Sequence, residues 1–486
     1  MGADANANPS EVRHAATVRN WDREADVVVV GFGCAGACAA IEAAEAGADV
    51  LLLERAGGGG GTSAMSGGLI YMGGGTPVQE ACGITDTPEQ MFTFLMAACG
   101  PEADEAKVRV FCEESVGHFH WLERHGVPFK RSSYPEPFTE PPTDDCLIFS
   151  GGEDAHPFDR ITPPVPRAHK PRHRGAAGGF LMQCLVAATE RSGAGVLTDA
   201  RCETLVVDGG AVVGVVVREG GGERLVRARR GVVLTAGSFI QNRDMVMRHS
   251  PLLWKCSYRL GVEGDDGRAI RMAMGAGADV IRMDAGEVAI PLTPPRRLMR
   301  GILVTQHGQR FINEDSYYGR VGQECLFHHD GRMYLIVDNA VYERNVAGFE
   351  ATHVEESVAD LERSLGMVPG VLQGTVALYN RHAAEGVDPL FHKNARYLQP
   401  LTSPPYAAID CGTDKVLWAT FTLGGLHTRP SGEVLTPDDR VIPGLYAAGR
   451  TTSGVAAYGY VSGISLGDGT FFGRLAGRHA ASAPRG

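Results

Sequence analysis

Residues 26–54, DVVVVGFGCAGACAAIEAAEAGADVLLLE, decide the fold. They contain a β-branched run, a glycine-rich turn, an alanine-rich segment that ends at Gly47, and a second apolar run that leads into Glu54. Short apolar runs on either side of a helical segment are typical of a strand–helix–strand unit. The stretch therefore predicts an α/β fold.

The glycines of the turn match the pattern GxGxxG at Gly31, Gly33 and Gly36, directly after the first predicted strand. In that context the first glycine permits a tight turn, the second lets the backbone approach a pyrophosphate, and the third allows close packing of helix and strand. The helix N-terminus attracts the phosphates. Glu54, at the end of the next strand, can accept both hydroxyls of a ribose. Both NAD and FAD use this unit, so the motif alone predicts a dinucleotide site.

Glycine-rich segments elsewhere in the chain favour the longer cofactor. RAGGGGGTSAMSGG (55–68) follows Glu54 and offers a second stretch of backbone along which a ligand could continue. Near the C-terminus, GLYAAGRTTSG (444–454) and GISLGDG (463–469) predict a strand, a turn and the start of a helix.

Together these segments resemble the flavoprotein family that contains fumarate reductases and 3-ketosteroid dehydrogenases. The resemblance covers nearly the whole chain and rests on the GxGxxG unit with Glu54, GGTSAMSGG, GVVLTAGSF, GQRFINE, TLGGL and IPGLYAAGR. It implies an α/β fold with an α+β insert, in which a Rossmann-like FAD-binding domain carries an inserted catalytic or capping domain. The predicted FAD-binding domain covers 22–280 and 405–486, and the inserted domain covers 281–404. Proline-rich 289–296 and 399–405 are candidate hinges.

The resemblance also implies how FAD is held. A helix that starts near Ser465 and Leu466 would place its positive end against the flavin pyrimidine and stabilise the negative charge of reduced FAD. No histidine lies in 57–68, where a covalently flavinylated relative carries one, so we expect non-covalent FAD. The expected contacts are Gly31, Gly33, Ala35, Gly36, Glu54, Arg55, Thr62, Ser63, Gly67, Gly68, Ala236, Gly237, Arg450, Ser465 and Leu466.

Three positions indicate the substrate class. Fumarate reductases carry an arginine five residues after the Asn of the RFxNE motif, a histidine before the GG motif and an arginine in the last loop. The matching positions here are Tyr318, Phe421 and Tyr460. Because the groups that bind a dicarboxylate are replaced by aromatic residues, we expect a small apolar ketone, most consistent with a steroid. The ketosteroid dehydrogenases carry tyrosines at the first and third positions.

The last loop, YGYVSG (458–463), bears on the regiochemistry. The Δ1-dehydrogenases carry Tyr-Pro-Gly there, whereas Tyr460-Val461-Ser462-Gly463 resembles the Tyr-x-Ser of the Δ4-(5α)-dehydrogenases. The resemblance implies an FAD-dependent oxidoreductase that desaturates the bond next to a 3-keto group, with Δ4-(5α) activity favoured. Δ1 activity, an enone reductase similar to fumarate reductase, and a flavin-bound sensor are the alternatives.

The chemistry requires one hydrogen to leave as a proton α to the ketone and the other as a hydride to the flavin. We assign Tyr460 and the N–H of Gly463 as donors to the ketone oxygen. A tyrosine with a pKa of about 10 is a poor base, so we expect Ser462 and Tyr318 to form a proton relay to solvent. Either of the two hydroxyls could take the proton from the substrate carbon. Tyr458 is the alternative ligand-facing phenol. We expect no histidine or carboxylate near these hydroxyls.

Composition limits the partners. With 57 Asp and Glu against 46 Lys and Arg, the formal charge of −11 argues against nucleic-acid binding. Eleven cysteines without a CxxC pair indicate reduced thiols and no metal site, as expected in the cytoplasm. The N-terminal residues lack an apolar signal-peptide core, and no long apolar run predicts a membrane span. The electron acceptor stays open.

Overall fold

The computed structural model describes residues 10–136, 141–292, 295–345 and 347–485. Strand β2 (Arg23–Val30), helix α1 (Cys34–Glu45) and strand β3 (Val50–Leu53) form the unit that the opening stretch predicts. The two strands are parallel, in a register that pairs Val27 with Val50. The prediction of an α/β fold is confirmed.

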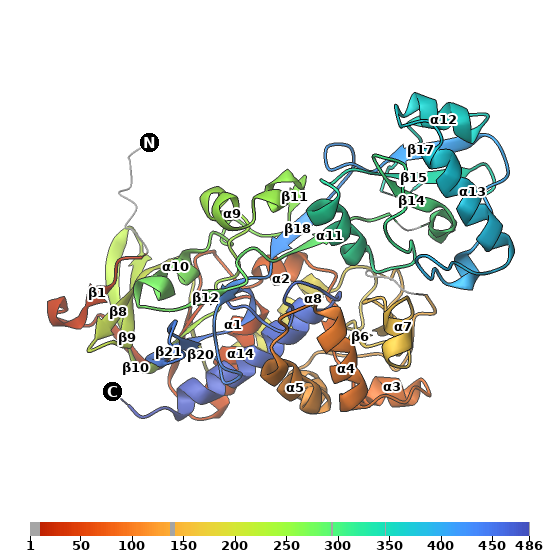
Figure 1. The fold of residues 1–486 in the computed structure, drawn as a ribbon. Coiled ribbons are helices and arrows are strands. Elements are labelled where there is room, and N and C mark those ends of the chain that lie inside the picture. The colour runs from red at the N-terminus through yellow and green to blue at the C-terminus, as the bar shows by residue number, and fades with distance from the viewer. Residues whose placement is uncertain (1–9, 137–140, 293–294, 346, 486) are drawn as a thin grey trace.

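In the described chain, β2 and β3 belong to a sheet of nine strands. Seven of them follow the order β1-β8-β9-β10-β2-β3-β7, while β21 pairs with β10 and β20 pairs with β21. The strands β8, β9 and β10 extend to the left in Figure 1. The other strands of this sheet are β1 (Arg13–His14), β7 (Gly195–Leu197), β8 (Ala200–Asp208), β9 (Ala211–Glu219), β10 (Gly222–Leu234), β20 (Glu433–Leu435) and β21 (Val441–Ala447).

Elements from the C-terminal part of the chain pack against the N-terminal strand–helix–strand unit and its sheet. β21 pairs in parallel with β10, and α14 (Ile464–Ser482) packs along α1. The helices approach closely because Gly473 and Gly477 face α1, where a Cβ would lie 2.3 Å from the carbonyl oxygen of Ala35 and 2.2 Å from that of Ala39. The C-terminal segment is therefore next to the GxGxxG turn.

The middle of the chain forms a second, antiparallel sheet with the order β14-β15-β17-β16. In Figure 1 it lies at the upper right together with α12 and α13. The strands and helices of this part of the chain are β14 (Ile302–Thr305), α11 (Tyr318–His328), β15 (Met333–Asp338), β16 (His353–Glu355), α12 (Val358–Ser364), α13 (Val371–Ala384) and β17 (Tyr406–Asp410).

The second sheet bears on the predicted domain division. β17 pairs with β15 from Tyr334↔Asp410 to Asp338↔Tyr406, so residues 406–410 belong to the sheet of the inserted segment. The boundaries at 280 and 404 stay predictions, and residues 293–294 of the first candidate hinge lie outside the described residues.

A small sheet, β11-β18-β13, lies between these two regions. It consists of β11 (Tyr258–Arg259), β13 (Gly286–Ala289) and β18 (Ala419–Thr422), and it pairs Glu287 with Phe421. Helix α11 packs tightly on β13, because a Cβ at Gly322 would lie only 2.2 Å from the carbonyl oxygen of Val288. This sheet therefore joins the inserted segment to the dinucleotide side of the molecule.

The remaining elements cover the central layer. Capping boxes start two of the helices, at Thr76 with Gln79 and at Thr87 with Gln90. The elements are α2 (Gly61–Met65), β4 (Ile70–Tyr71), α3 (Pro77–Ala81), α4 (Pro88–Ala98), α5 (Glu105–Glu113), α6 (Ser115–Arg124), β5 (Leu147–Ile148), α7 (Phe158–Ile161), β6 (Ala168–His169), α8 (Gly178–Arg191), α9 (Arg243–His249), α10 (Arg268–Gly275), β12 (Val280–Ile281) and β19 (Gly425–Leu426).

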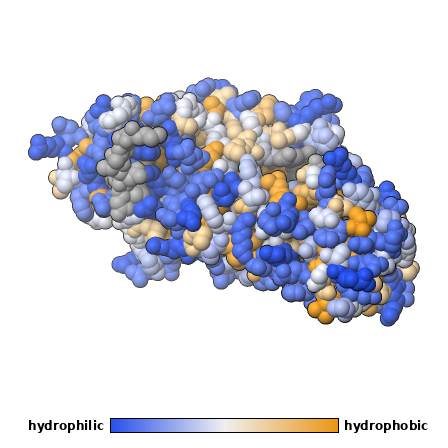
Figure 2. Space-filling model, turned by 90° about the horizontal axis from the view of Figure 1, so that it is seen from above, coloured by the Kyte–Doolittle hydropathy of each residue, from blue (hydrophilic) through white to orange (hydrophobic). Residues whose placement is uncertain are grey.

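The outer surface is mainly polar on the face drawn in Figure 2, where apolar residues form small scattered groups. Over the residues that the structure describes, every helix is too short or too polar to span a bilayer. Residues 1–9, which belong to the segment examined for a signal peptide, lie outside that part of the chain.

Candidate active site

A cavity of about 690 Å³ lies where the GxGxxG turn, the start of α14 and the strands β13 and β18 meet. Its size is that of a cofactor or substrate site. It collects all four predicted catalytic residues, Tyr318, Tyr460, Ser462 and Gly463. Of the predicted FAD contacts, those that line it are Gly31, Gly33, Ala35, Glu54, Arg55, Thr62, Ser63, Gly67, Gly68, Ala236, Gly237, Arg450, Ser465 and Leu466.

The three motif glycines have different surroundings, as their predicted roles require. Gly31 has φ +103°, and a Cβ there would lie 2.7 Å from the carbonyl oxygen of Thr235. Gly36 is absent from the cavity wall because it packs inward, where a Cβ would lie 1.9 Å from the carbonyl oxygen of Gly31. At Gly33 a Cβ would meet only Ser63 Oγ, at 3.4 Å. The backbone at Gly33 is thus open to the cavity, which fits a pyrophosphate.

Glu54 holds the turn as well as facing the cavity. Its Oε2 accepts a hydrogen bond from the N–H of Phe32 and its Oε1 accepts one from the N–H of Ala56, both at 2.8 Å. Because each carboxylate oxygen has a second acceptor position, Glu54 can also accept ribose hydroxyls. Its structural role was not part of the prediction.

Asp265 is a site residue that the sequence analysis missed. Its Oδ1 accepts a hydrogen bond from the N–H of Ser238 at 2.8 Å, and its Oδ2 accepts one from the hydroxyl of Thr62. Arg450 Nη2 lies 3.7 Å from Oδ1. At Gly237, with φ +82°, a Cβ would lie 2.4 Å from the same oxygen. Asp265 lies in the sequence GDDG (264–267), which predicts a turn. This pattern does not indicate which residues the carboxylate contacts.

Tyr460 lies in the loop that leads into α14. Its hydroxyl donates to Ser465 Oγ at 3.0 Å, and its ring contacts Phe421 edge to face at 5.3 Å. Gly463, with φ +100°, precedes the first helical residue. Burial raises the pKa of Tyr460 well above its ordinary value. The phenol therefore stays protonated, as a hydrogen-bond donor to a ketone must.

Tyr458, the alternative to Tyr460, has a different environment. Its hydroxyl donates to Asp284 Oδ1 at 3.0 Å, and it is absent from the residues that line the cavity. Tyr460 therefore lines the cavity, whereas Tyr458 does not.

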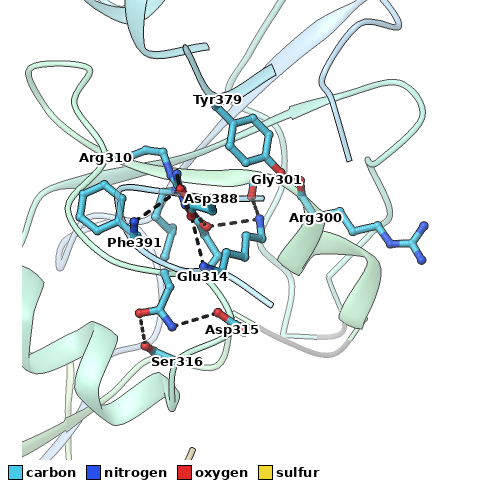
Figure 3. A network of polar contacts seen from close by, with 12 residues as sticks. Arg300, Gly301, Arg310, Glu314, Asp315, Ser316, Tyr379, Asp388 and Phe391 are labelled. Carbon is cyan, nitrogen blue, oxygen red and sulfur yellow. Dashed lines mark hydrogen bonds and ion pairs between the residues drawn. The ribbon is translucent and has the colours of Figure 1, made fainter. Parts of the chain in front are cut away.

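A buried ionic network fixes the segment that leads into Tyr318 (Figure 3). Arg310 donates to both oxygens of Glu314, at 2.9 and 2.8 Å, and to Asp388 at 3.1 and 2.9 Å. Lys393 Nζ lies 3.2 Å from Glu314 Oε2, and all four side chains are almost fully buried. Bidentate pairs of this kind restrict geometry strongly. The RFINE motif therefore positions the beginning of α11.

Ser462 and Tyr318, the predicted relay, are both half-buried in the cavity wall. The backbone of Ser462 is held by Ser150, whose hydroxyl donates to the Ser462 carbonyl at 2.7 Å. The roles of these two hydroxyls in proton transfer stay a prediction.

The expectation that no carboxylate lies near the hydroxyls is wrong. Glu287, on β13, lines the cavity, is 1% exposed, and accepts a hydrogen bond from Tyr317 at 2.9 Å. The ring of Tyr317 lies 4.5 Å from that of Tyr318. Burial raises the pKa of Glu287 to about 8. The signal in the sequence is a single acidic residue within the short apolar strand GEVA.

Comparison with known proteins agrees with this geometry. Residues 26–466 match the family described as FAD binding domain. The 3-ketosteroid-Δ4-(5α)-dehydrogenase of Rhodococcus jostii RHA1, solved in complex with 4-androstene-3,17-dione, is 50% identical with a TM-score of 0.93, over 97% of this chain and 100% of that one. The 3-oxo-5-alpha-steroid 4-dehydrogenase of Comamonas testosteroni is 29% identical over 88% of this chain and 93% of its own.

A third relative, the NADH:fumarate oxidoreductase of Klebsiella pneumoniae (strain 342), is 28% identical over 95% of this chain, which spans 48% of that protein's length. The chain belongs to the FAD-binding flavoprotein family that includes fumarate reductases and 3-ketosteroid dehydrogenases. It is an FAD-dependent oxidoreductase of the class that acts on CH–CH groups. The predicted family, cofactor and enzyme class are therefore confirmed.

Proposed function

We propose that this protein is a 3-ketosteroid dehydrogenase that desaturates the carbon–carbon bond next to the 3-keto group, with Δ4-(5α) desaturation favoured. The observation that carries the proposal is the group of aromatic residues that line the cavity. Tyr318, Phe421 and Tyr460 stand there, where the resemblance places the cationic groups of fumarate reductases. The 50% identity to the Rhodococcus Δ4-(5α)-dehydrogenase supports the same substrate class.

FAD, when bound, supplies the acceptor for the hydride. Gly31, Gly33 and Glu54 would hold its dinucleotide part, while Ser465 and Leu466 would lie at its ring system. The absence of a histidine in 57–68 favours non-covalent binding.

Tyr460 and the N–H of Gly463 orient the ketone. A protonated phenol that donates to the carbonyl oxygen stabilises the negative charge that develops as the α-proton leaves, and such a donor contributes about 2.7–4 kcal/mol in comparable sites. The contact with Ser465 fixes the phenol before substrate arrives, and the ketone oxygen then replaces Ser465 Oγ as the acceptor of the single phenol proton. Tyr318 and Ser462, which also line the cavity, lead the proton away from the substrate carbon.

The experiment is steady-state turnover of a 5α-3-ketosteroid with an artificial electron acceptor, with the product identified by mass spectrometry and NMR. A 4-ene product supports the proposal. A 1-ene product would assign the protein to the Δ1 type, and the absence of turnover with any acceptor would favour a flavin-bound sensor.

A fumarate-type reductase is the second candidate, favoured by the 28% identity to the NADH:fumarate oxidoreductase. Reduced protein incubated with fumarate separates the two candidates, because a site without the cationic clamp should not turn over a dicarboxylate. The physiological electron acceptor stays open. A cytoplasmic location is proposed from the cysteine composition, and the eleven cysteines are free in the structure.

A further inference from the structure

Glu287 is a buried carboxyl group with half of its hydrogen-bonding capacity unused. Oε1 accepts the hydroxyl of Tyr317, whereas Oε2 is buried and has no hydrogen-bond partner within the described chain. Unpaired buried polar atoms are uncommon and call for an explanation. Glu287 lines the cavity, so this carboxyl group belongs to the wall of the proposed reaction site.

Close packing of α11 on β13 places the Glu287 carboxyl group next to the tyrosine rings. A Cβ at Gly319 would lie 2.0 Å from Glu287 Oε1, so only a glycine in the first turn of α11 leaves room for the carboxyl. Gly322, one turn later, allows the same helix to contact β13. This close approach places the hydroxyl of Tyr317 against Glu287 and the ring of Tyr318 against Tyr317.

The charges around Glu287 leave it able to gain and lose a proton. The groups that line the cavity with it are Tyr317, which caps α11, Tyr318 in the first turn of α11, and Tyr460 in the last loop. β18 contributes the uncharged Phe421, over which Arg450 lies at 5.0 Å. Over the described residues, no cation is within ion-pair distance of the carboxyl. Burial without a cation raises the pKa of Glu287 to about 8, close to neutrality.

We propose that Glu287 holds the proton that the substrate loses from the carbon α to its ketone. The proton leaves the α-carbon through the hydroxyls of the cavity wall and ends on Oε2, while the electron pair of the broken C–H bond forms the enolate stabilised by Tyr460. The hydride from the neighbouring carbon goes to oxidised flavin, which balances the dehydrogenation. Solvent later removes the proton from Glu287. This inference rests on the proposed function and supplies the acceptor that a relay of neutral hydroxyls lacks.

The test isolates proton transfer from hydride transfer. Protein with its flavin reduced cannot accept a hydride, so a 5α-3-ketosteroid incubated with it in D₂O can only exchange its α-protons, which mass spectrometry counts. We expect the exchange rate to rise with pH through about 8, as Glu287 ionises. Glu287→Gln should lower the rate above this pH by about 10²-fold or more and remove the pH dependence.

Two further variants separate this role from a structural one. Tyr317→Phe removes a donor that stabilises the ionised carboxylate, so the midpoint of the pH profile should move upward. Glu153→Gln is the matched control. Glu153 is also 1% exposed, accepts a tyrosine hydroxyl (Tyr71) at 2.9 Å and has a pKa raised to about 7, but it does not line the cavity. It should leave the exchange unchanged.

Infrared difference spectroscopy of the oxidised protein gives a readout that needs no substrate. A buried carboxylic acid band should titrate near pH 8, disappear in Glu287→Gln and persist in Glu153→Gln. Glu153 gives its own band, which should titrate near pH 7 and disappear in Glu153→Gln. A band titrating near pH 8 that persists in Glu287→Gln, or exchange in that variant with the rate and pH dependence of the unaltered protein, would overturn the inference. Absence of exchange in the unaltered protein would instead count against the steroid function, while the infrared titration would still decide whether Glu287 holds a proton.

Discussion

The hydroxyl of Tyr460 donates to Ser465 Oγ at 3.0 Å, in the first turn of α14. This contact fixes a phenol at the helix start, where the flavin ring is expected. Burial keeps that phenol protonated by raising its pKa. The phenol is therefore held in place before substrate arrives, and it turns its one proton from Ser465 Oγ to the ketone oxygen when the ketone binds.

Replacement of this donor tests its role. Tyr460→Phe should lower kcat/KM for a 3-ketosteroid by about 10²–10³-fold, the usual loss for an oxyanion donor. Tyr458→Phe is the control, because its hydroxyl contacts Asp284 outside the cavity, and it should keep near-normal kinetics. If Tyr458→Phe were the impaired variant and Tyr460→Phe active, the assignment of the loop would be reversed.

Glu54→Ala should weaken FAD retention. The change removes acceptors for the N–H groups of Phe32 and Ala56 as well as the expected contact to the ribose, so the turn loosens and the nucleotide loses a partner. Flavin release during gel filtration, followed by absorbance, measures the effect. The exposed Glu190→Ala serves as a control, and equal flavin retention in the two variants would contradict the assigned role.

Gly36→Ala should be strongly destabilising. A Cβ at this position would lie 1.9 Å from the carbonyl oxygen of Gly31, so the helix and the turn must separate, at a cost of about 1–3 kcal/mol or more. Gly374→Ala in α13 is the matched change, since a Cβ there has no heavy atom within 4 Å. Its expected effect is neutral to slightly stabilising. Thermal unfolding of both variants checks the comparison, and similar melting temperatures would refute it.

The raised pKa of Glu287 predicts a pH effect on stability. The ordinary value is 4.5 and the folded value is about 8, so between these values the unfolded chain releases the proton while the folded chain keeps it. The free energy of unfolding therefore falls as pH rises from about 4.5 to about 8, by about 1.4 kcal/mol per pH unit.

Glu287→Gln removes this titration, so its melting temperature should fall less between pH 5 and pH 8.5 than that of the unaltered protein. Glu153→Gln should reduce the fall only up to about pH 7, because the pKa of that residue is raised only to about 7. If the melting temperatures of the unaltered protein and Glu287→Gln fell equally between pH 5 and pH 8.5, the raised pKa of Glu287 would be contradicted.

The sequence could predict the strand–helix–strand unit and most of the cavity wall, because glycine positions, helix starts and short motifs act locally. The close contact of Gly36 with the carbonyl oxygen of Gly31, for instance, lies within the motif itself. Glu287 and Asp265 were missed for a physical reason. Their roles arise only when distant segments pack, as when Gly319 and Gly322 bring α11 onto β13, and a single carboxylate in a strand or turn carries no periodic signal.

The most direct test of the account is anaerobic addition of a 5α-3-ketosteroid to the oxidised, FAD-loaded protein while the flavin absorbance is recorded. A dehydrogenase with this site should transfer a hydride from the steroid without any external reductant, so the flavin band should bleach in one turnover and a 4-ene-3-ketosteroid should form in equal amount. A flavin band that stays oxidised with every 3-ketosteroid, together with reduction of an enone or of fumarate by the chemically reduced protein, would contradict the central claim.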